Sequence, residues 1–344
     1  MKKLFLILSS FILLNVCAHA EDFLARVKVK DKWGYINRSG VLVITPKYAG
    51  ALDFSDGLAA VKFANSWGYV DKYDKEVIPS KFDRAENFIN GIARVKVGDN
   101  WGYIDKKGEY VIKPIYKNAE NFSEGLARVK ETEQWGYIDN SGKYIINPQF
   151  EAAKEFSSGL AMVKQKGKWG YINKKGEVAI SQEFEVYKKF SDGLAAVKQK
   201  GLWGFIDPTG NMVIKPQYET ADKFVDGYAR IKSGGKWGYI DKSGNVAVKS
   251  IYKGAEPFSE GLAKVKEKEL WGYIDASGKY IINPEFEYAK DFKEGYAVIR
   301  KSDKMGYIDK TGKVIIQPTY DDAKPFKKAT AGGDGDDEEN GPGE

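Results

Sequence analysis

The feature that most constrains this chain is a Trp-Gly pair that recurs every 34 residues without an insertion. The tryptophans are Trp33, Trp67, Trp101, Trp135, Trp169, Trp203, Trp237 and Trp271, and Met305 takes the ninth place. Phenylalanines keep the same step, beginning with Phe54, Phe88, Phe122 and Phe156. Phased from Phe23 to Lys328, nine units of 34 fill 306 residues. The chain is therefore one tandem array rather than several unrelated domains.

Glycine and period-two patterns distinguish strands from helices in a repeat of this length. Each unit holds about three glycines in fixed places, such as Gly91, Gly102 and Gly108, and each would cost about 1 kcal/mol inside a helix. Runs such as residues 58–62 alternate in polarity, as strands do. Turns such as residues 105–108 begin with Asp, which can cap turn amides, and end with Gly, which tolerates positive φ.

Each unit is predicted to be a three-stranded antiparallel meander, with about 27 short strands in all. The third strand is expected to end at a proline such as Pro114, which lacks a ladder N–H, and a loop such as residues 119–125 leads into the next unit. One meander cannot fold alone, so neighbours must bury each other's Trp and Phe side chains as the repeat core. The fold class is all-β, an open solenoid or superhelical array. A closed propeller-like ring is the alternative, disfavoured because 34 residues is short for a four-stranded blade.

This constellation resembles the bacterial WG-repeat family, also called KWG. The matching motifs are G-L-A-x-V-K, K-W-G-Y-I-D-x-x-G-x-x-V-I-x-P-x-Y/F and A-x-x-F-S-x-G, read at residues 159–193 and in the other copies. The resemblance implies a β-rich fold and an exported or surface-associated protein. It implies no catalytic activity and no set of functional residues. The sequence departs from the pattern at Met305, at Ser181-Gln182 in the proline position, and at Tyr187, which replaces Ala.

The two ends of the chain differ from the repeats in residues 21–328. Residues 1–20 combine two lysines, a short apolar run and small residues before Glu21, which predicts a cleaved signal peptide. The run is too short to cross a bilayer core of about 30 Å, so the mature chain is expected to have no transmembrane segment and to be periplasmic, cell-surface or secreted. Lipidation at Cys17 is an alternative. Residues 329–344 predict a disordered acidic tail.

Composition excludes several chemistries. The single cysteine and single histidine, Cys17 and His19, lie in the predicted signal, which leaves no thiol, disulfide or imidazole for catalysis or metal binding. Asp in the turns is interpreted as a cap, because Asn37 and Asn173 take the same place. A repeat without long insertions offers no asymmetric catalytic constellation, so we expect no enzyme, no metal and no cofactor. Residues 21–328 carry a formal charge of +10 against +6 for the whole chain, but export and the lack of an Arg-rich patch argue against nucleic acid.

Two columns of side chains are candidates for a binding ladder. One column contains Lys62, Lys96, Lys130, Lys164 and Lys198, and the other contains Tyr69, Tyr103, Tyr137 and Tyr171. Cations and ring faces at regular spacing could grip an anionic polymer, a glycan or a peptide through many weak contacts. The plainer interpretation is that Lys covers the solvent face of a strand and Tyr packs with its hydroxyl at the rim. We expect a non-catalytic exported scaffold that binds a protein, peptide or envelope component, with a carbohydrate- or cell-wall-binding module as the alternative.

Overall fold

The computed structural model describes residues 23–180 and 184–329. These residues form nine antiparallel sheets, which confirms the all-β prediction. The described chain divides into two compact units, one built from both ends, up to Pro114 and from Asp321 onward, and the other from Ile115–Tyr320. The predicted signal peptide, residues 1–20, lies outside the described residues, as does the predicted acidic tail apart from Ala329. Ala329 is buried in the core of the first sheet.

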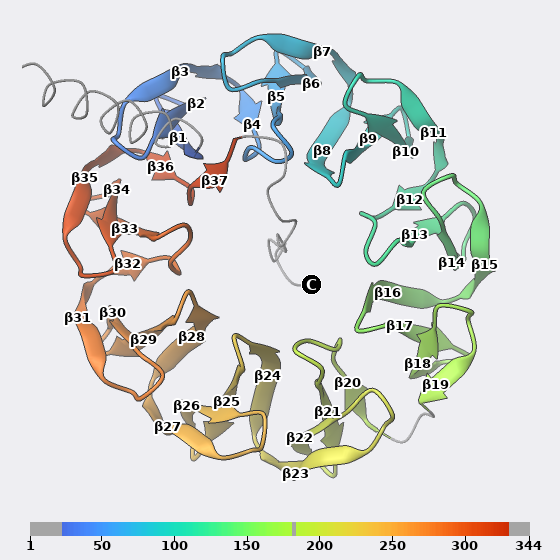
Figure 1. Ribbon diagram of the computed structural model, residues 1–344, viewed down its shortest axis with the longest axis vertical. Coiled ribbons are helices and arrows are strands. Elements are labelled where there is room, and N and C mark those ends of the chain that lie inside the picture. The colour runs from blue at the N-terminus through green and yellow to red at the C-terminus, as the bar shows by residue number, and fades with distance from the viewer. Residues whose placement is uncertain (1–22, 181–183, 330–344) are drawn as a thin grey trace, which may run out of the picture. The chain divides into compact units, whose positions relative to one another are not determined.

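The first sheet joins the two ends of the repeat array (Figure 1). It contains β1 (Phe23–Val29), β2 (Lys32–Asn37) and β3 (Leu42–Tyr48) together with β36 (Asp322–Ala323) and β37 (Lys327–Lys328). β1 pairs with β36 through Val27 opposite Ala323, and with β37 through Leu24 opposite Lys327. Pairing of the first strand with the last closes the array in the manner of a β-propeller. The closed alternative is therefore correct, and the open solenoid is wrong.

The other eight sheets have four strands each and follow one another along the chain. The first of these sheets contains β4 (Gly50–Ala51), β5 (Ala59–Phe63), β6 (Ser66–Val70) and β7 (Glu76–Phe82). The second contains β8 (Arg84–Ile89), β9 (Ile92–Val97), β10 (Asn100–Asp105) and β11 (Tyr110–Tyr116). The third contains β12 (Asn118–Ala119), β13 (Ala127–Lys130), β14 (Trp135–Ile138) and β15 (Tyr144–Phe150). The fourth sheet contains β16 (Ala152–Ser157), β17 (Leu160–Gln165), β18 (Lys168–Asn173) and β19 (Val178–Ile180). The fifth contains β20 (Val186–Tyr187), β21 (Ala195–Gln199), β22 (Leu202–Ile206) and β23 (Met212–Tyr218). The sixth sheet contains β24 (Thr220–Val225), β25 (Tyr228–Ser233), β26 (Lys236–Asp241) and β27 (Val246–Tyr252). The seventh contains β28 (Gly254–Ser259), β29 (Leu262–Glu267), β30 (Leu270–Ile274) and β31 (Tyr280–Phe286). The eighth contains β32 (Tyr288–Ala289), β33 (Tyr296–Lys301), β34 (Lys304–Asp309) and β35 (Val314–Tyr320).

Eight of the nine sheets have one strand more than the meander that the sequence predicts, and the first sheet has two more, β36 and β37. The extra strand comes from the segment expected to be a loop, as in β12, which pairs with β13 although it has two residues. The extra strand has two residues in β4, β12, β20 and β32 and six in β8, β16, β24 and β28, all drawn from the segment expected to be a loop. A 34-residue unit can therefore supply a complete blade, which is why the length argument against a propeller fails. Because the extra strand ends one unit and pairs with the next, every sheet spans a repeat boundary.

The glycine of each Trp-Gly pair admits the backbone of the last strand of its sheet. In the sheet of β12 to β15, Trp135 faces Phe150 and Tyr137 faces Ile146, so β15 bulges between these two pairs. A Cβ on Gly136 would lie 2.7 Å from the carbonyl oxygen of Ile146 and 2.8 Å from the nitrogen of Pro148. The third strand of the meander was expected to end at its proline, but β15 continues through Pro148 to Phe150. The proline falls in the bulge, where it can be accommodated without breaking the strand.

Aromatic side chains fill the space between neighbouring sheets. Tyr137 and Phe156 are buried, and their ring centroids are 4.9 Å apart. Of the phenylalanines predicted to be core, Phe54 and Phe88 are also buried, and Phe122 is half-buried. Trp101 is buried, while the other tryptophans are half-buried at the edge of the core, namely Trp33, Trp67, Trp135, Trp169, Trp203, Trp237 and Trp271. The tryptophans thus form a boundary layer rather than the centre of the core.

The Asp turns between the last two strands of each sheet are capped as expected. The Asp71 Oδ1 atom accepts the backbone N–H of Tyr73 at 2.9 Å and of Lys75 at 3.0 Å. Asn37 and Asn173 accept the same two hydrogen bonds in their own turns. This confirms the capping interpretation of the Asp column.

Candidate interaction surface

The predicted tyrosine ladder lies in the core. Tyr69, Tyr103, Tyr137 and Tyr171 are at most 1% exposed. Three of their hydroxyls donate to main-chain carbonyls of the next sheet or its leading segment, at Glu86 (2.7 Å), Lys154 (2.6 Å) and Lys188 (2.5 Å). Burial raises the pKa of Tyr69, Tyr137 and Tyr171. These rings cannot offer a face to a ligand, which corrects the binding-ladder hypothesis for the tyrosine column.

The lysine ladder is half-buried beside the tryptophan rings. Each member faces the Trp of its own hairpin across the two strands; the members are Lys62, Lys96, Lys130, Lys164 and Lys198. Farther along the same column, the Nζ atoms of Lys232 and Lys266 lie 5.8 Å from the ring centroids of their tryptophans. Lys130 also pairs with Glu133 at 3.6 Å. The lysines therefore help to cover the tryptophans, and their ammonium groups are partly engaged within the fold.

A second set of basic residues, which the sequence analysis missed, lies over the tryptophan rings. We call them the junction cations: Arg26, Arg94, Arg128, Arg230 and Lys264. The Arg128 guanidinium lies 5.2 Å from the Trp135 centroid and donates to the carbonyl of Ala153 in the next sheet. The Lys264 Nζ lies 4.8 Å from the Trp271 centroid and donates to the Ala289 carbonyl at 2.8 Å. Each junction cation thus caps a tryptophan face, worth about 0.5–2 kcal/mol, and for four of the five a hydrogen bond to the neighbouring sheet is resolved.

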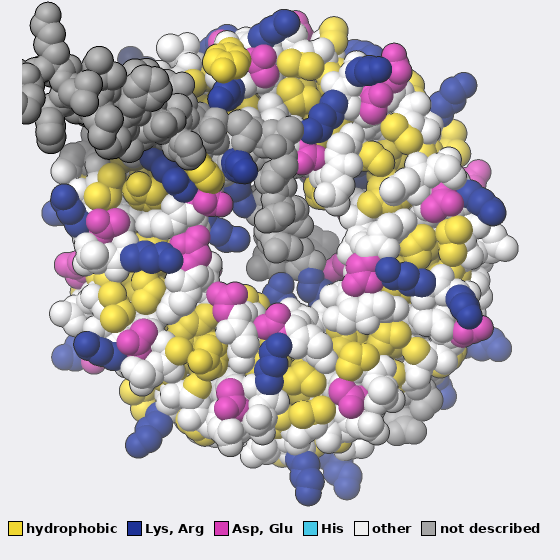
Figure 2. Space-filling model, viewed as in Figure 1, with side chains coloured by type: hydrophobic (Ala, Val, Ile, Leu, Met, Phe, Trp, Pro, Cys, Tyr) yellow, Lys and Arg dark blue, Asp and Glu magenta, His cyan; other side chains and the backbone are white. Residues whose placement is uncertain are grey.

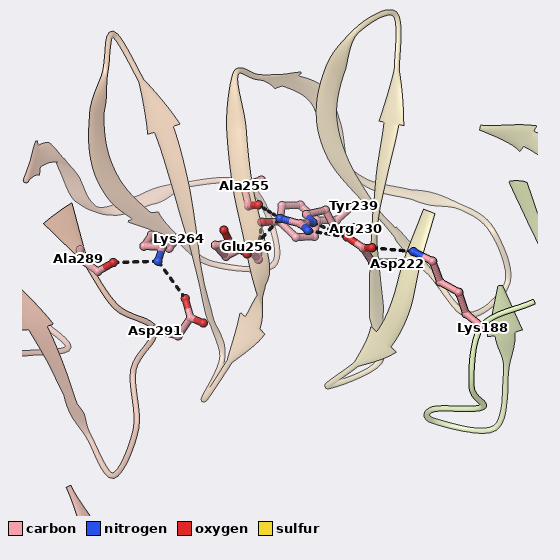
Figure 3. Close-up of polar contacts among 9 residues, drawn as sticks. All are labelled: Lys188, Asp222, Arg230, Tyr239, Ala255, Glu256, Lys264, Ala289 and Asp291. Atoms are coloured by element: carbon pink, nitrogen blue, oxygen red, sulfur yellow. Dashed lines mark hydrogen bonds and ion pairs between the residues drawn. The ribbon is translucent and has the colours of Figure 1, made fainter. Parts of the chain in front are cut away.

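Three sheets of the second unit share a continuous ionic network (Figure 3). Lys188, directly after β20, pairs with Asp222 of β24 at 3.0 Å. The Arg230 Nε of β25 lies 2.7 Å from the same carboxylate, and its Nη1 lies 3.1 Å from Glu256 of β28. The Tyr239 hydroxyl donates to the Glu256 carbonyl at 2.5 Å. The network therefore ties each sheet to its successor with charged side chains.

The Asp222 carboxyl responds to two opposing influences. Burial would raise its pKa, but Arg230 and Lys188 together outweigh burial, so its pKa is lowered. The carboxylate form is therefore favoured by the folded chain. Because burial and pairing nearly offset each other in such sites, the network fixes the geometry of the junctions more than it adds to stability.

Where the junction cation is absent, its neighbours change with it. Met162 replaces the cation, and Tyr187 replaces the alanine whose carbonyl would accept from it. The Tyr187 ring is buried and packs on Tyr171, with centroids 5.5 Å apart. In the next sheet Ala196 takes the cation's place, and Lys188 lies 4.8 Å from the Trp203 centroid and donates to the Ala221 carbonyl. The departure at Tyr187 is thus a repacked junction.

The apolar side chains left exposed gather on the last strands, which we define as β3, β7, β11, β15, β19, β23, β27, β31 and β35. The second residue of most of these strands is valine or isoleucine, and each is 37–45% exposed: Val43, Val77, Val111, Ile145, Val213, Ile281 and Ile315. We call this set the apolar column. Each last strand is an edge of its sheet, with one strand neighbour in the sheet order. These strands therefore offer apolar side chains beside an open backbone edge.

Two features are absent from the described part of the chain. No group of three or more His, Cys, Asp or Glu side chains there is arranged to hold a metal ion. Among the same residues, no helix has the length and apolar character needed to cross a bilayer. The face drawn in Figure 2 carries basic and acidic side chains interspersed with apolar ones.

The family model for the WG containing repeat matches the sequence nine times in succession, at residues 33–65, 67–101, 101–133, 135–169, 169–203, 203–237, 237–271, 271–304 and 305–331. The chain belongs to the WG-containing repeat family. No curated protein matches the sequence.

A solved structure shares the fold of this WG-repeat chain. A crystal structure of a eukaryotic initiation factor matches with a TM-score of 0.64 at 12% identity, over 90% of this chain and 99% of that chain. At this identity the likeness concerns the fold alone. The dihydro-heme d1 dehydrogenase NirN (12% identity, 90% of this chain, 75% of that chain, TM-score 0.47) and Kluyveromyces lactis Hsv2p (9%, 65%, 91%, 0.39) also match. With TM-scores below 0.5, these two add nothing to the assignment.

The junction cations could have been found in the WG-repeat sequence from one signal. Each stands 25 residues before an alanine, and where Met162 breaks the column Tyr187 breaks the alanine column at the same spacing. The pattern escapes a search for uniform columns because Ala60, Met162, Ala196 and Val298 interrupt it. Residues that change together at fixed spacing point to contacts between repeats.

Proposed function

We propose that this WG-repeat chain is an exported, non-catalytic scaffold that binds a protein or peptide partner through the last strands of its blades. The observation that carries the proposal is the apolar column. Threonine would give similar strand propensity, and lysine would protect a free edge from unwanted pairing. Valine or isoleucine at so many exposed edges therefore favours a surface that is covered by a partner.

The rest of the fold supports a binding role. Repeat β-propellers are typical protein-binding scaffolds, and a repeated surface multiplies weak contacts. The non-catalytic part of the proposal is inferred from repetition, because a reaction usually needs different groups at one place. The carbohydrate-binding alternative depended on exposed tyrosine rings, and the burial of Tyr69, Tyr103, Tyr137 and Tyr171 removes that stacking platform.

The binding proposal can be tested with substitutions that keep shape and strand propensity. Residues 21–344 are immobilised and exposed to envelope proteins and, separately, to purified envelope polymers. The double variant Val111→Thr with Val213→Thr should lose the retained protein, because Thr is nearly isosteric with Val but polar. Val97→Thr is the matched control, since Val97 is 39% exposed but lies at the end of β9. Equal retention by all three proteins, or retention of polymer alone, would refute the proposal.

Export is tested separately through the N-terminal segment. We propose cleavage before Glu21, based on the small residues that precede it. Expression of the full chain followed by fractionation and N-terminal sequencing should give an exported protein that starts at Glu21. A protein that starts at Cys17 and carries acyl groups would establish the lipoprotein alternative, and an uncleaved cytoplasmic chain would exclude export.

A further inference from the structure

Strand β27 differs from the other long last strands because it contains no proline. Proline stands at the same register in six of them, at Pro46, Pro114, Pro148, Pro216, Pro284 and Pro318. Since proline has no N–H, the ladder with the neighbouring strand does not need a donor at this place. Ser250 takes the position in β27 and restores the donor. The described residues of β19 also lack proline, but this strand has three residues.

Strand β7 shows what an amide at this place can do. Ser80 stands at the register of Ser250, and its backbone N–H donates to the Glu76 carboxylate at 3.0 Å in an exposed hydrogen bond. The Ser80 N–H is thus directed to a side-chain acceptor at the surface. The residue of β27 that corresponds to Glu76 is Val246, which has no acceptor. β27 therefore presents an edge donor without the carboxylate cap that β7 has.

The side chains around this edge combine apolar and basic character. Val246 at one end of β27 is 63% exposed, and Ile251 near the other end is 60% exposed. Both values exceed those of the apolar column. Between them Lys249 is exposed, and Lys253 follows the strand with its side chain 61% exposed, 3.5 Å from Glu269. In the sheet order β27 pairs with β26 and has no strand on its other side.

We propose that β27 accepts an extended acidic segment of a partner protein as an additional strand. The backbone of the added strand pairs with the edge that includes the Ser250 N–H, and its apolar side chains cover Val246 and Ile251. Its carboxylates lie near Lys249 and Lys253, which sets the preference for an acidic segment. This inference rests on the proposed binding function and adds where the partner docks and in what form.

The test uses residues 21–344 and two labelled heptapeptides, one alternating valine with glutamate and one alternating valine with lysine. Fluorescence anisotropy should show saturable binding of the glutamate peptide and at least tenfold weaker binding of the lysine peptide. Ser250→Pro should weaken binding of the glutamate peptide at least tenfold, because the ring removes the donor and blocks the added strand. Circular dichroism should be unchanged, since six other last strands fold with proline there.

A charge-matched pair of variants tests the position independently. Val246→Glu recreates the carboxylate cap of β7 and should weaken binding of the glutamate peptide. Met212→Glu places the same charge at the same register of β23 and should leave binding unchanged. Hydrogen exchange of residues 246–252 should slow when the glutamate peptide is added to the wild-type chain.

Several outcomes would overturn the inference. They are equal binding of both peptides, unchanged binding by Ser250→Pro, and equal loss in Val246→Glu and Met212→Glu. A dimer of the wild-type chain that Ser250→Pro abolishes, without peptide binding, would identify a second copy as the occupant instead. If Val111→Thr with Val213→Thr still loses the envelope partner while Ser250→Pro retains it, the proposed function stands and the assignment to β27 fails.

Discussion

Replacing Gly102 by alanine tests why tryptophan is followed by glycine in each repeat. An alanine Cβ would lie 2.6 Å from both the carbonyl oxygen of Ile112 and the nitrogen of Pro114. Non-bonded contacts of carbon are most favourable at about 3.5–4.0 Å, so β10 and β11 would have to separate by about 1 Å. The nearest atoms all belong to the backbone and cannot rotate away. We expect the free energy of unfolding to fall by about 3 kcal/mol or more, at the upper end of overpacking costs.

The assay combines urea unfolding, followed by tryptophan fluorescence, with hydrogen exchange of residues 110–116. Gly91→Ala is the matched control, because Gly91 lies in the hairpin turn between β8 and β9 of the same sheet, with φ of +81° and no atom near the added Cβ. It should cost about 1–2 kcal/mol from the left-handed backbone alone and leave exchange of β11 unchanged. If Gly102→Ala cost no more than Gly91→Ala and did not loosen β11, the steric explanation of the Trp-Gly pair would be wrong.

Three further predictions concern the junctions between sheets. Tyr137→Phe leaves the Lys154 carbonyl without its hydroxyl donor and should lower the free energy of unfolding in urea by about 1–3 kcal/mol. Phe205→Tyr, in the same column, should be neutral or stabilising, and equal effects of the two substitutions would refute the role of this hydrogen bond. Arg230→Met removes a partner of Asp222 and should lower the free energy of unfolding by about 1–3 kcal/mol in the same assay. An unchanged free energy of unfolding would show that the network does not stabilise the fold. Burial raises the pKa of tyrosines such as Tyr69, so their stabilisation is full below about pH 10 and is lost as pH rises through the raised folded pKa. Phenolate absorbance should therefore rise together with unfolding, and phenolate formed in a folded chain would contradict the burial.

The elements that could be predicted from the sequence depend on local chemistry. The Trp-Gly step, the β character and the Asp-capped turns each follow from a few adjacent residues, as at residues 105–108. Closure could not be predicted, because Val27 and Ala323 come from opposite ends of the array and nothing nearby in sequence marks their pairing. An open array would show the same repeat spacing. The fourth strand escaped for a related reason, since two residues such as Asn118–Ala119 are too few to show a period-two pattern. Where this strand has six residues, as in β16, a register shift between Ala153 and Phe156 breaks the pattern.

The candidate site was harder to predict than the fold. Tyrosine is found both in cores and on surfaces. Tyr137 can be buried because the next sheet places the Lys154 carbonyl 2.6 Å from its hydroxyl. That carbonyl belongs to β16, which lies in the segment that the sequence predicts to be a loop. The exposure of Val111 likewise depends on β11 being an edge, which the sheet order fixes and the sequence does not.

The hairpin tips between the first two strands of the sheets show that equivalent junctions are not alike. Glu124 and Glu260 adopt positive φ, which costs a non-glycine residue about 1–2 kcal/mol. Each accepts the N–H of a glycine in the next tip, at 3.0 Å, and each forms an ion pair with a lysine in the turn between the last two strands of the next sheet, Lys174 or Lys310. At Ser158, one tip after Glu124, the residue in the lysine position is Pro208, and this contact cannot form. In a repeat array stability is a sum of unit terms and neighbour terms. Asp56 and Asp192 accept the N–H of Gly91 and Gly227 in the same way. These four tips alternate along the described chain, so the blade repeats with every unit while this contact between neighbouring tips recurs at every second one.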